Sequence, residues 1–205
     1  MLQAGPRIWA KRTIDLTVAV AVLTASAPVL AVASLAVAFT LGPPVLFRQR
    51  RPGKNGVPFD IIKLRTMVEP KEGEEPRSDA ERLTRLGRLL RATSIDEIPQ
   101  LFNVLRGEMS LVGPRPLLLE YLPLYTPEQA RRHDVLPGMT GWAQVNGRNA
   151  LSHEERFALD VWYVDHWSLA LDLRILGLTF LKLFARRGIS SQGHATMPKF
   201  TGASP

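Results

Sequence analysis

The sequence contains no cysteine, and this absence excludes several kinds of chemistry. Without thiols the chain can form no structural disulfide, no thiolate metal site and no cysteine nucleophile. The absence is consistent with a reducing compartment. Histidine is also scarce, and the four histidines lack metal-ligand spacing of the H-x-x-x-H kind. We therefore interpret them as surface or structural residues.

Acidic residues are fewer than basic residues, at 19 against 26, which gives a formal net charge of +7. This balance indicates an anionic partner such as a membrane surface, a nucleotide or a nucleic acid. Nucleic-acid binding ranks last, because it rests on net charge alone and leaves the long apolar run described next unexplained. Hydrophobic residues make up 45% of the 205 residues, which is enough for one sizeable domain.

Charge is nearly absent from residues 14–41, where Asp15 is the only charged residue. This run is longer than the apolar part of a secretory signal peptide. As a straight helix it would measure about 42 Å, more than the roughly 30 Å of a bilayer core. Pro28 lies at its middle, where a proline removes a backbone hydrogen bond and kinks a helix.

Basic residues flank the apolar run on both sides, at positions 7, 11 and 12 before it and at 48, 50, 51 and 54 after it. Basic flanks prefer the cytoplasm. We therefore predict a re-entrant membrane helix over residues 1–42 that breaks near Pro28 and returns to the same side. Each half would be about 20 Å long, too short to cross alone. A single kinked span is the alternative.

Two short strands are predicted after the apolar run, over residues 45–50 and 59–65. The turn between them contains Asn55-Gly56, and this dipeptide is typical of a β-hairpin. Strand alternation puts Lys63 and Arg65 on one face. We take both as candidate substrate-binding residues, with a solvated face as the alternative.

Two adjacent carboxylates, Asp96 and Glu97, stand just before a proline. Ser94 and Glu97 have the spacing of a capping box, while Pro99 fits the first turn of a helix. Both interpretations put the acids at or just before the N-terminus of a helix that ends at Gly107. Partial positive charge at that end keeps an acid ionised, available to bind a metal or attack as a nucleophile. Ordinary helix capping is the alternative.

Two arginines near the acidic pair are candidate phosphate-binding residues. Leucines repeat at helical spacing across residues 80–91, which predicts a helix whose last residue, Arg91, reaches the acidic pair. Arg115 stands between Pro114 and Pro116, and the fixed φ angles of two prolines make a stiff mount for a guanidinium. A solvated helix face and an exposed loop arginine are the alternatives.

The C-terminal half predicts helices over residues 121–133, 152–167 and 169–184. The last is apolar but carries three charges, which suits a helix lying in a membrane interface. Residues 136–148 are punctuated by glycine and contain Gln144 and Arg148, two further candidate substrate-binding residues, although a plain structured turn is the alternative. Residues 188–205 are rich in glycine, serine and proline and predict a disordered tail.

Several segments of the chain carry longer motifs in a defined order. They are Lys11-Arg12-Thr13-Ile14-Asp15, Gly42-Pro43-Pro44-Val45-Leu46-Phe47-Arg48-Gln49, Lys63-Leu64-Arg65-Thr66-Met67, and residues 93–104, 110–116, 136–148 and 160–172. A set of long motifs in order is far more specific than any single one. From about residue 11 to residue 187 the chain resembles the bacterial sugar transferases, the monotopic phosphoglycosyl transferases that start glycan assembly on polyprenol phosphate.

The resemblance implies a reaction and its residues. Asp96 would attack the β-phosphorus of a UDP-sugar and release UMP, and polyprenol phosphate would then take the phosphosugar from Asp96. Glu97 would bind metal or handle protons, with Asp96 as a further metal ligand. Mg²⁺ is the expected cofactor, because it prefers carboxylate and phosphate oxygens. Arg91 and Arg115 would contact phosphate.

The resemblance also implies an architecture and a place in the cell. The fold is expected to be α+β and mostly helical, with a re-entrant helix, a small β-hairpin and amphipathic interfacial helices. The family breaks its membrane helix at a Ser-Pro pair, whereas this chain has Ala27-Pro28 with Ser26 one place early. The chain resembles the minimal catalytic form.

A catalytic domain over residues 43–187 would lie on the cytoplasmic face of a bacterial inner membrane, with a phospholipid membrane, a UDP-sugar and polyprenol phosphate as partners. The sugar, the glycan pathway and a homo-oligomeric state stay open. The alternative function is a non-catalytic protein that binds anionic lipids at the membrane surface.

Overall fold

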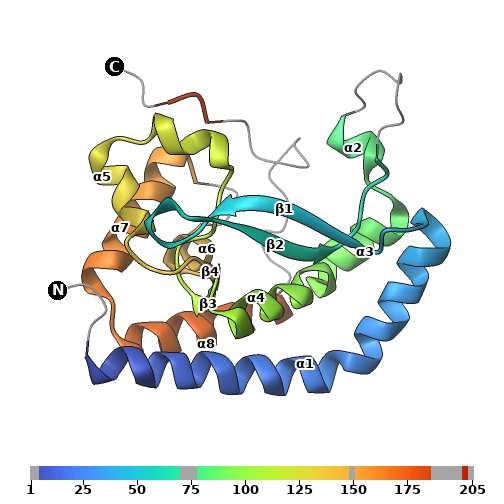
Figure 1. Cartoon of the computed structure of the whole chain (residues 1–205), viewed down its shortest axis with the longest axis horizontal. Helices are drawn as coiled ribbons and strands as arrows, with labels where there is room; N and C mark the ends of the chain where they lie inside the picture. The colour runs from blue at the N-terminus through green and yellow to red at the C-terminus, as the bar shows by residue number, and fades with distance from the viewer. Residues whose placement is uncertain (1–4, 70–77, 148–150, 186–199, 203–205) are drawn as a thin grey trace.

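The computed structural model describes residues 5–69, 78–147, 151–185 and 200–202 (Figure 1). Its elements in chain order are α1 (Pro6–Leu41), β1 (Leu46–Pro52), η1 (Lys54–Gly56), β2 (Pro58–Leu64), α2 (Asp79–Arg82), α3 (Arg85–Thr93), η2 (Ile95–Gln100), α4 (Leu101–Arg106), β3 (Ser110–Val112), η3 (Leu119–Leu124), α5 (Pro127–Ala130), η4 (Arg131–His133), β4 (Gly138–Thr140), α6 (Trp142–Asn146), α7 (His153–His166) and α8 (Leu169–Ala185), where η marks a 3₁₀ helix. The predicted α+β class, mostly helical with a small antiparallel hairpin, is confirmed.

The N-terminal apolar run forms one continuous helix of 36 residues, α1, with Pro28 inside it. The helix bends along its length, so that its two halves run in different directions (Figure 1). Proline lacks the N–H that would bond the carbonyl four residues earlier, and this loss accounts for a bend. The predicted break at Ala27 and Pro28 is therefore corrected to a bend, because one missing bond leaves the other turns of the helix intact.

Both halves of α1 pack on the rest of the chain. In the first half, Ala19 is fully buried in the main core with residues of α4, β3 and α8. In the second half, Ala33 and Val37 pack against Leu64 of β2 and Leu90 of α3. The opposite face of α1 exposes large apolar side chains, among them Val20, Val32, Leu35 and Phe39. By length and composition α1 is the one helix among the described residues that could cross a membrane.

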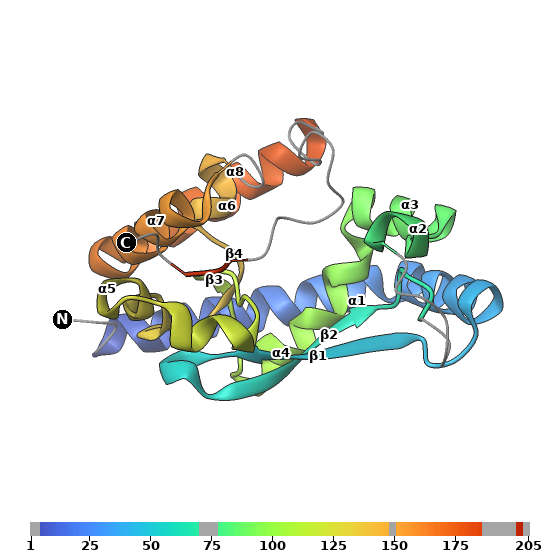
Figure 2. The same ribbon diagram turned by 90° about the horizontal axis from the view of Figure 1, so that it is seen from above.

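The predicted hairpin is confirmed. Strand β1 pairs antiparallel with β2, from Leu46 opposite Leu64 to Pro52 opposite Pro58. Asn55 and Gly56 in the connecting turn both have positive φ angles, 55° and 74°, the backbone conformation that makes Asn-Gly a turn dipeptide. The hairpin joins the two ends of the molecule, with α2 and α3 at one end and α5 and α7 at the other (Figures 1 and 2).

Two predicted helices are divided in the structure. The helix predicted over residues 80–91 becomes α2 and α3, because Leu83 leaves the helix to form a β-bridge with Met67, and Thr84 caps a new helix by accepting the N–H of Gly87. The helix predicted over residues 121–133 becomes η3, α5 and η4. Tyr125 and Thr126 have extended backbone angles and separate η3 from α5, and Pro127 then begins α5, where its missing N–H leaves no helix bond unmade.

The C-terminal helices are predicted correctly. Ser152 and Glu155 form a capping box at the start of α7, and α8 covers the predicted apolar segment. The predicted disordered tail lies largely outside the described residues, but Phe200 does not fit it. Phe200 is buried against Tyr121 and Phe157, and its backbone N–H donates to the Tyr121 hydroxyl at 3.1 Å. Packing among these aromatic rings gives Phe200 a fixed place in the structure.

Candidate active site

The acidic pair lies in the first turn of η2, which runs directly into α4. The predicted position at the start of a helix is therefore confirmed, and so is the helix end at Gly107, which has a left-handed φ of 82°. The predicted Ser94 capping box is wrong. Ser94 itself adopts a left-handed conformation with φ of 58°, ends α3, and makes no side-chain cap hydrogen bond.

Glu97 is held by two cations. Lys63 Nζ of β2 donates to Glu97 Oε1 at 2.7 Å, and Arg115 Nη2 donates to the same oxygen at 2.5 Å. Arg115 Nη1 reaches Oε2 at 3.4 Å. Burial favours the neutral acid, but the charges and hydrogen bonds of Arg115 and Lys63 outweigh it and hold the pKa of Glu97 well below its usual range.

Asp96 has the opposite environment. Its side chain is 6% exposed, and among the described residues nothing forms a hydrogen bond or ion pair with it. Burial, reinforced by the negative charge of Glu97, raises the pKa of Asp96 to about 6, against the opposing charges of Lys63, Arg91 and Arg115. An acid with this pKa is still mostly ionised at neutral pH, as expected, although desolvation brings it close to titration.

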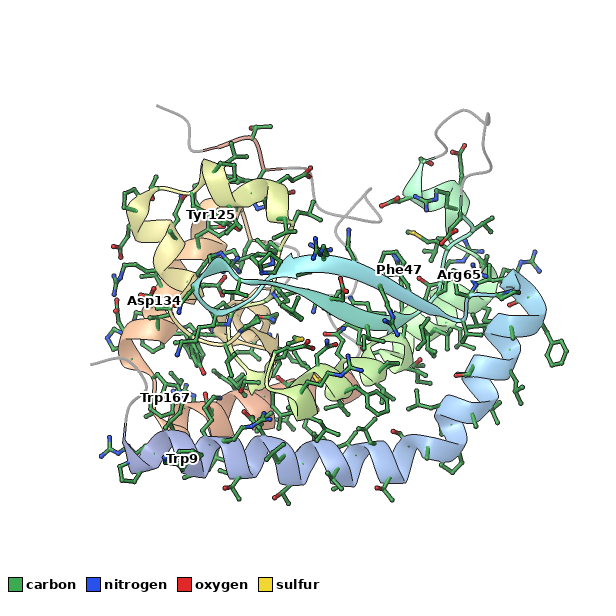
Figure 3. The ribbon with its side chains drawn as sticks, viewed as in Figure 1. Trp9, Phe47, Arg65, Tyr125, Asp134 and Trp167 are labelled. Carbon is green, nitrogen blue, oxygen red and sulfur yellow. The ribbon has the colours of Figure 1, made fainter. Side chains whose placement is uncertain are left out.

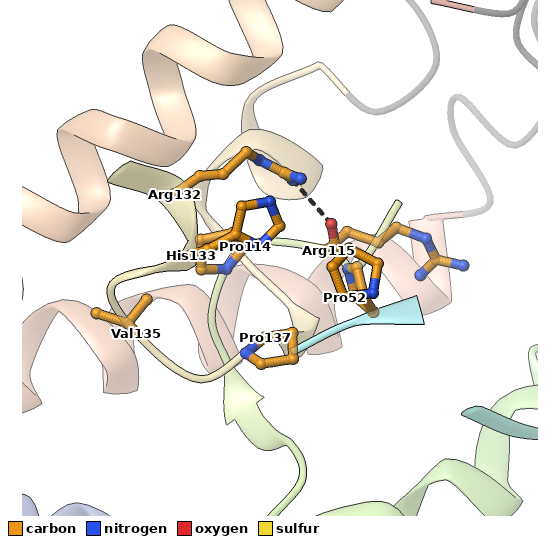
Figure 4. Close-up of a pocket in the computed structure, with 8 residues that line it drawn as sticks. Pro52, Pro114, Arg115, Arg132, His133, Val135 and Pro137 are labelled. Carbon is orange, nitrogen blue, oxygen red and sulfur yellow. Dashed lines mark hydrogen bonds between the residues drawn. The ribbon is translucent and has the colours of Figure 1, made fainter. Parts of the chain in front are cut away.

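The two predicted phosphate-binding arginines lie near this pair. Arg91 of α3 donates from Nε to Thr66 Oγ1 at 3.1 Å, and its charge acts on Asp96. Arg115 contacts Glu97 directly. The carbonyl of Arg115 accepts a hydrogen bond from Arg132 Nη2 at 2.8 Å (Figure 4). The stiff mount predicted from the flanking prolines is therefore reinforced by a third residue.

One predicted substrate-binding residue, Arg65, makes its hydrogen bonds away from the acidic pair. Arg65 lies at the end of the hairpin beside the C-terminus of α1 (Figure 3), and its guanidinium donates to the carbonyls of Leu41, Gly42 and Pro43. It satisfies the free carbonyls of a helix end. Gln144 of α6 has both amide atoms buried without a partner. Arg148 lies outside the described residues.

Buried ion pairs behind the site were not recognised from the sequence. Arg132 pairs with Asp160 at 2.7 Å, and both side chains are almost fully buried. Lys11 of α1 pairs with Asp172 of α8 at 2.6 Å. Lys11 Nζ also donates to the carbonyl of Val112, three residues before Arg115. Lys11, Asp160 and Asp172 belong to the motifs at residues 11–15 and 160–172, whereas Arg132 lies in none of the motifs.

The carboxylates at the acidic pair could supply part of a magnesium site. Among the described residues no group of three or more acidic, histidine or cysteine side chains is placed to hold a metal ion. Mg²⁺ commonly takes one or two carboxylates and completes its shell with substrate phosphates and water. Asp96 with its neighbour Glu97 fits that donor set, and Asp96 is the freer of the two.

Comparisons with known proteins identify the family of the chain. The sequence model described as "Bacterial sugar transferase" matches residues 6–186. The chain is 53% identical over 194 residues to the "Uncharacterized sugar transferase EpsL" of Bacillus subtilis, covering 94% of this chain and 96% of that protein.

Two relatives with named substrates are larger. The chain is 48% identical to the "UDP-glucose:undecaprenyl-phosphate glucose-1-phosphate transferase" of Caulobacter vibrioides, over 81% of this chain and 66% of that protein. It is 44% identical to the "Undecaprenyl-phosphate glucose phosphotransferase" of Komagataeibacter xylinus, over 86% of this chain but 36% of that protein. The expectation of a transferase enzyme is confirmed, and the chain belongs to the bacterial sugar transferase family.

Proposed function

We propose that this protein is a phosphoglycosyl transferase that moves a sugar 1-phosphate from a UDP-sugar to polyprenol phosphate. The observation that carries the proposal is the state of Asp96, a buried carboxylate without a partner beside three cationic side chains. A buried charge without a hydrogen bond is costly, and such groups concentrate at functional sites. The names of the Caulobacter and Komagataeibacter relatives support the choice of donor and acceptor.

The reaction proceeds in two displacements at one phosphorus atom. A carboxylate oxygen of Asp96 attacks the β-phosphorus of the UDP-sugar, and the bond from that phosphorus to the bridging oxygen breaks. UMP leaves with the bridging oxygen, and the sugar phosphate stays on Asp96. A phosphate oxygen of polyprenol phosphate then attacks the same phosphorus and returns Asp96 as a carboxylate. Held at the reacting atom, Asp96 gains reactivity from position rather than basicity.

The remaining site residues bind phosphate oxygens or hold the groups that bind them. Arg91 and Arg115 bind phosphate oxygens, which a guanidinium contacts in a bidentate way. Lys63 keeps Glu97 charged and in place, so that Glu97 orients Arg115. Mg²⁺, held by Asp96 and Glu97 with the diphosphate, would neutralise charge on the leaving phosphate.

The membrane arrangement is also a proposal. Lys11 and Ala19 in the first half of α1, and Ala33 and Val37 in the second, all contact the same catalytic domain. A helix crossing the bilayer would separate its two ends, whereas these contacts keep both beside one domain. This supports a re-entrant helix and a monotopic protein on the cytoplasmic face of the inner membrane, where basic residues are preferred.

A mass-spectrometric experiment tests the covalent step. Purified protein is incubated with Mg²⁺ and a panel of UDP-sugars without acceptor, and UMP and intact protein mass are measured. We expect about one UMP per protein and a mass increase of one sugar phosphate on a peptide that contains Asp96. Asp96→Asn should lose both signals while staying folded and membrane-bound. Lipid binding without UMP release from any UDP-sugar would instead support the non-catalytic scaffold.

A further inference from the structure

A groove between α1, the β1–β2 hairpin and α4 is separate from the contacts made by Glu97. Its volume is about 380 Å³, within the roughly 300–1,000 Å³ of small-molecule sites. The residues that line it are Leu30, Ala31, Ser34, Leu46, Arg48, Ile62, Leu64, Pro99, Phe102 and Arg106.

The walls of the groove are mainly apolar and partly open. Phe102 is 47% exposed and Leu46 is 39% exposed, although both are large hydrophobic side chains. Leu46 pairs directly with Leu64 across the hairpin, so both side chains stand on the same face. A UDP-sugar is polar throughout and does not match such walls. A hydrocarbon chain does.

Two arginines complete the groove. Arg48 stands on β1, and Arg106 is the last residue of α4. Among the described residues neither side chain forms an ion pair or a hydrogen bond, so both charges are available to a ligand. Apolar walls with two available cations match a molecule that joins a hydrocarbon chain to a phosphate group.

The groove leads toward the reacting carboxylate. In a 3₁₀ helix, side chains three residues apart lie one above the other. Asp96 and Pro99 are three apart in η2 and therefore share a face, and Pro99 lines the groove. A lipid lying in the groove would reach Asp96 along this face.

We propose that this groove is the docking site of the polyprenol phosphate acceptor, an inference that rests on the proposed function. The walls around Leu46, Leu64 and Phe102 hold the isoprenoid chain, while Arg48 and Arg106 attract its phosphate. A phosphate monoester carries roughly −1.5 to −2 charges at neutral pH, which matches two arginines. A phospholipid carries one phosphodiester charge and two chains, a poorer match for two cations and one groove.

Kinetic measurements test the acceptor site. Arg48→Gln, Arg48→Gln/Arg106→Gln and Phe102→Ser are compared with Arg50→Gln, which matches Arg48→Gln by removing one charge from β1 outside the groove. UDP-glucose and undecaprenyl phosphate are the probes. We expect KM for undecaprenyl phosphate to rise about tenfold or more in the groove variants, with KM for UDP-glucose unchanged. Equal acceptor KM values in the groove variants and Arg50→Gln would overturn the proposal.

Two further measurements separate a failure of the groove proposal from a failure of the proposed reaction, and an acceptor site from a phospholipid site. UMP release from UDP-glucose without acceptor should be unchanged in the groove variants, because the first displacement does not use the groove. If wild type releases no UMP, the proposed reaction fails, and direct binding of undecaprenyl phosphate still tests the groove. The assays are repeated in bilayers of phosphatidylcholine alone and with phosphatidylglycerol. An effect seen only with phosphatidylglycerol would assign the groove to an anionic phospholipid and overturn the proposal.

Discussion

Asp96 and Glu97 are adjacent in the chain, yet their carboxylates have opposite surroundings. Glu97 accepts hydrogen bonds from Lys63 and Arg115, whereas Asp96 is buried without a partner among the described residues. Burial raises the pKa of Asp96 to about 6, and the two cations hold the pKa of Glu97 below its usual range. At neutral pH both acids are charged, but only Asp96 is close to titration.

The rate of UMP release should depend on pH through Asp96. The ionised carboxylate attacks, so the rate should fall as pH drops through about 6, approaching tenfold per unit below that value. The measurement is the single-turnover rate between pH 5 and 8 without acceptor. A rate that stays constant down to pH 5 would contradict an attacking carboxylate with this pKa.

Removing the Asp96 charge should stabilise the fold. The pKa of Asp96 rises from 3.8 to about 6 on folding, so its ionised form opposes folding, and the cost appears as pH rises from about 4 through 6. Asp96→Asn should therefore gain up to about 3 kcal/mol at pH 7, since one pKa unit corresponds to about 1.4 kcal/mol. Thermal unfolding in detergent checks this, and the gain should shrink toward pH 4. Lower stability of Asp96→Asn at pH 7 would contradict it.

Glu97→Gln should shift the pH profile to lower pH. The charge of Glu97 raises the pKa of Asp96, and the substitution also leaves Lys63 and Arg115 free to lower it. The acid limb of the UMP-release profile should move down while the maximal rate falls, because Arg115 loses its orienting partner. The free energy of unfolding should also fall. The loss should exceed the roughly 0–1 kcal/mol of a surface ion pair but stay below the roughly 3–5 kcal/mol of a buried one, since the pair is partly buried. An unmoved acid limb would argue against this coupling.

The Lys11–Asp172 pair should anchor α1 to α8. Both side chains are under 10% exposed, and Asp172 also accepts hydrogen bonds from Tyr163 and Trp167. Lys11→Met leaves a buried carboxylate without its cation and should cost about 3 kcal/mol. Lys11→Met/Asp172→Asn should recover part of this loss, because the amide is neutral, its oxygen can accept from Trp167 and its NH2 can donate to the Tyr163 hydroxyl, which donates in turn to the Val112 carbonyl. Unfolding free energies of the two single variants and the double variant measure the coupling.

Labelling from one side of a vesicle tests the re-entrant helix. The chain has no cysteine, so single cysteines introduced as Arg7→Cys and Lys54→Cys give a clean background. Both positions are exposed, one on each side of the apolar run. An impermeant thiol reagent should reach both from the same side of the membrane. Labelling from opposite sides would mean a true span.

Local pattern predicted much of the secondary structure. The Asn55-Gly56 dipeptide predicted the hairpin, and helical periodicity predicted α7 and α8, because turn geometry and amphipathicity act over a few residues. Predictions that treated neighbouring segments as one helix failed. The leucine periodicity continues past residue 84, yet Thr84 caps a second helix there. The division depends on the pairing of Leu83 with Met67, sixteen residues earlier in the chain.

The candidate site was likewise predictable in part from the sequence, and the rest depended on tertiary contacts. The sequence identified Asp96, Glu97, Arg91 and Arg115 through their spacing and through the family motifs, and the fold brings these residues close together. It did not predict that Arg65 would cap α1. That outcome depends on where a helix 36 residues long ends relative to the hairpin.

By itself, the sequence determined the long apolar helix with its central proline, the hairpin, the paired acids ahead of a short helix, and the lack of any thiol chemistry. Only the tertiary structure decided which of the two acids is paired with cations. A carboxylate's pKa depends on burial and on nearby charges, and Lys63 and Arg115 approach Glu97 from 34 and 18 residues away. Chain folding, rather than residue order, delivers both cations to one acid and leaves its neighbour unpaired.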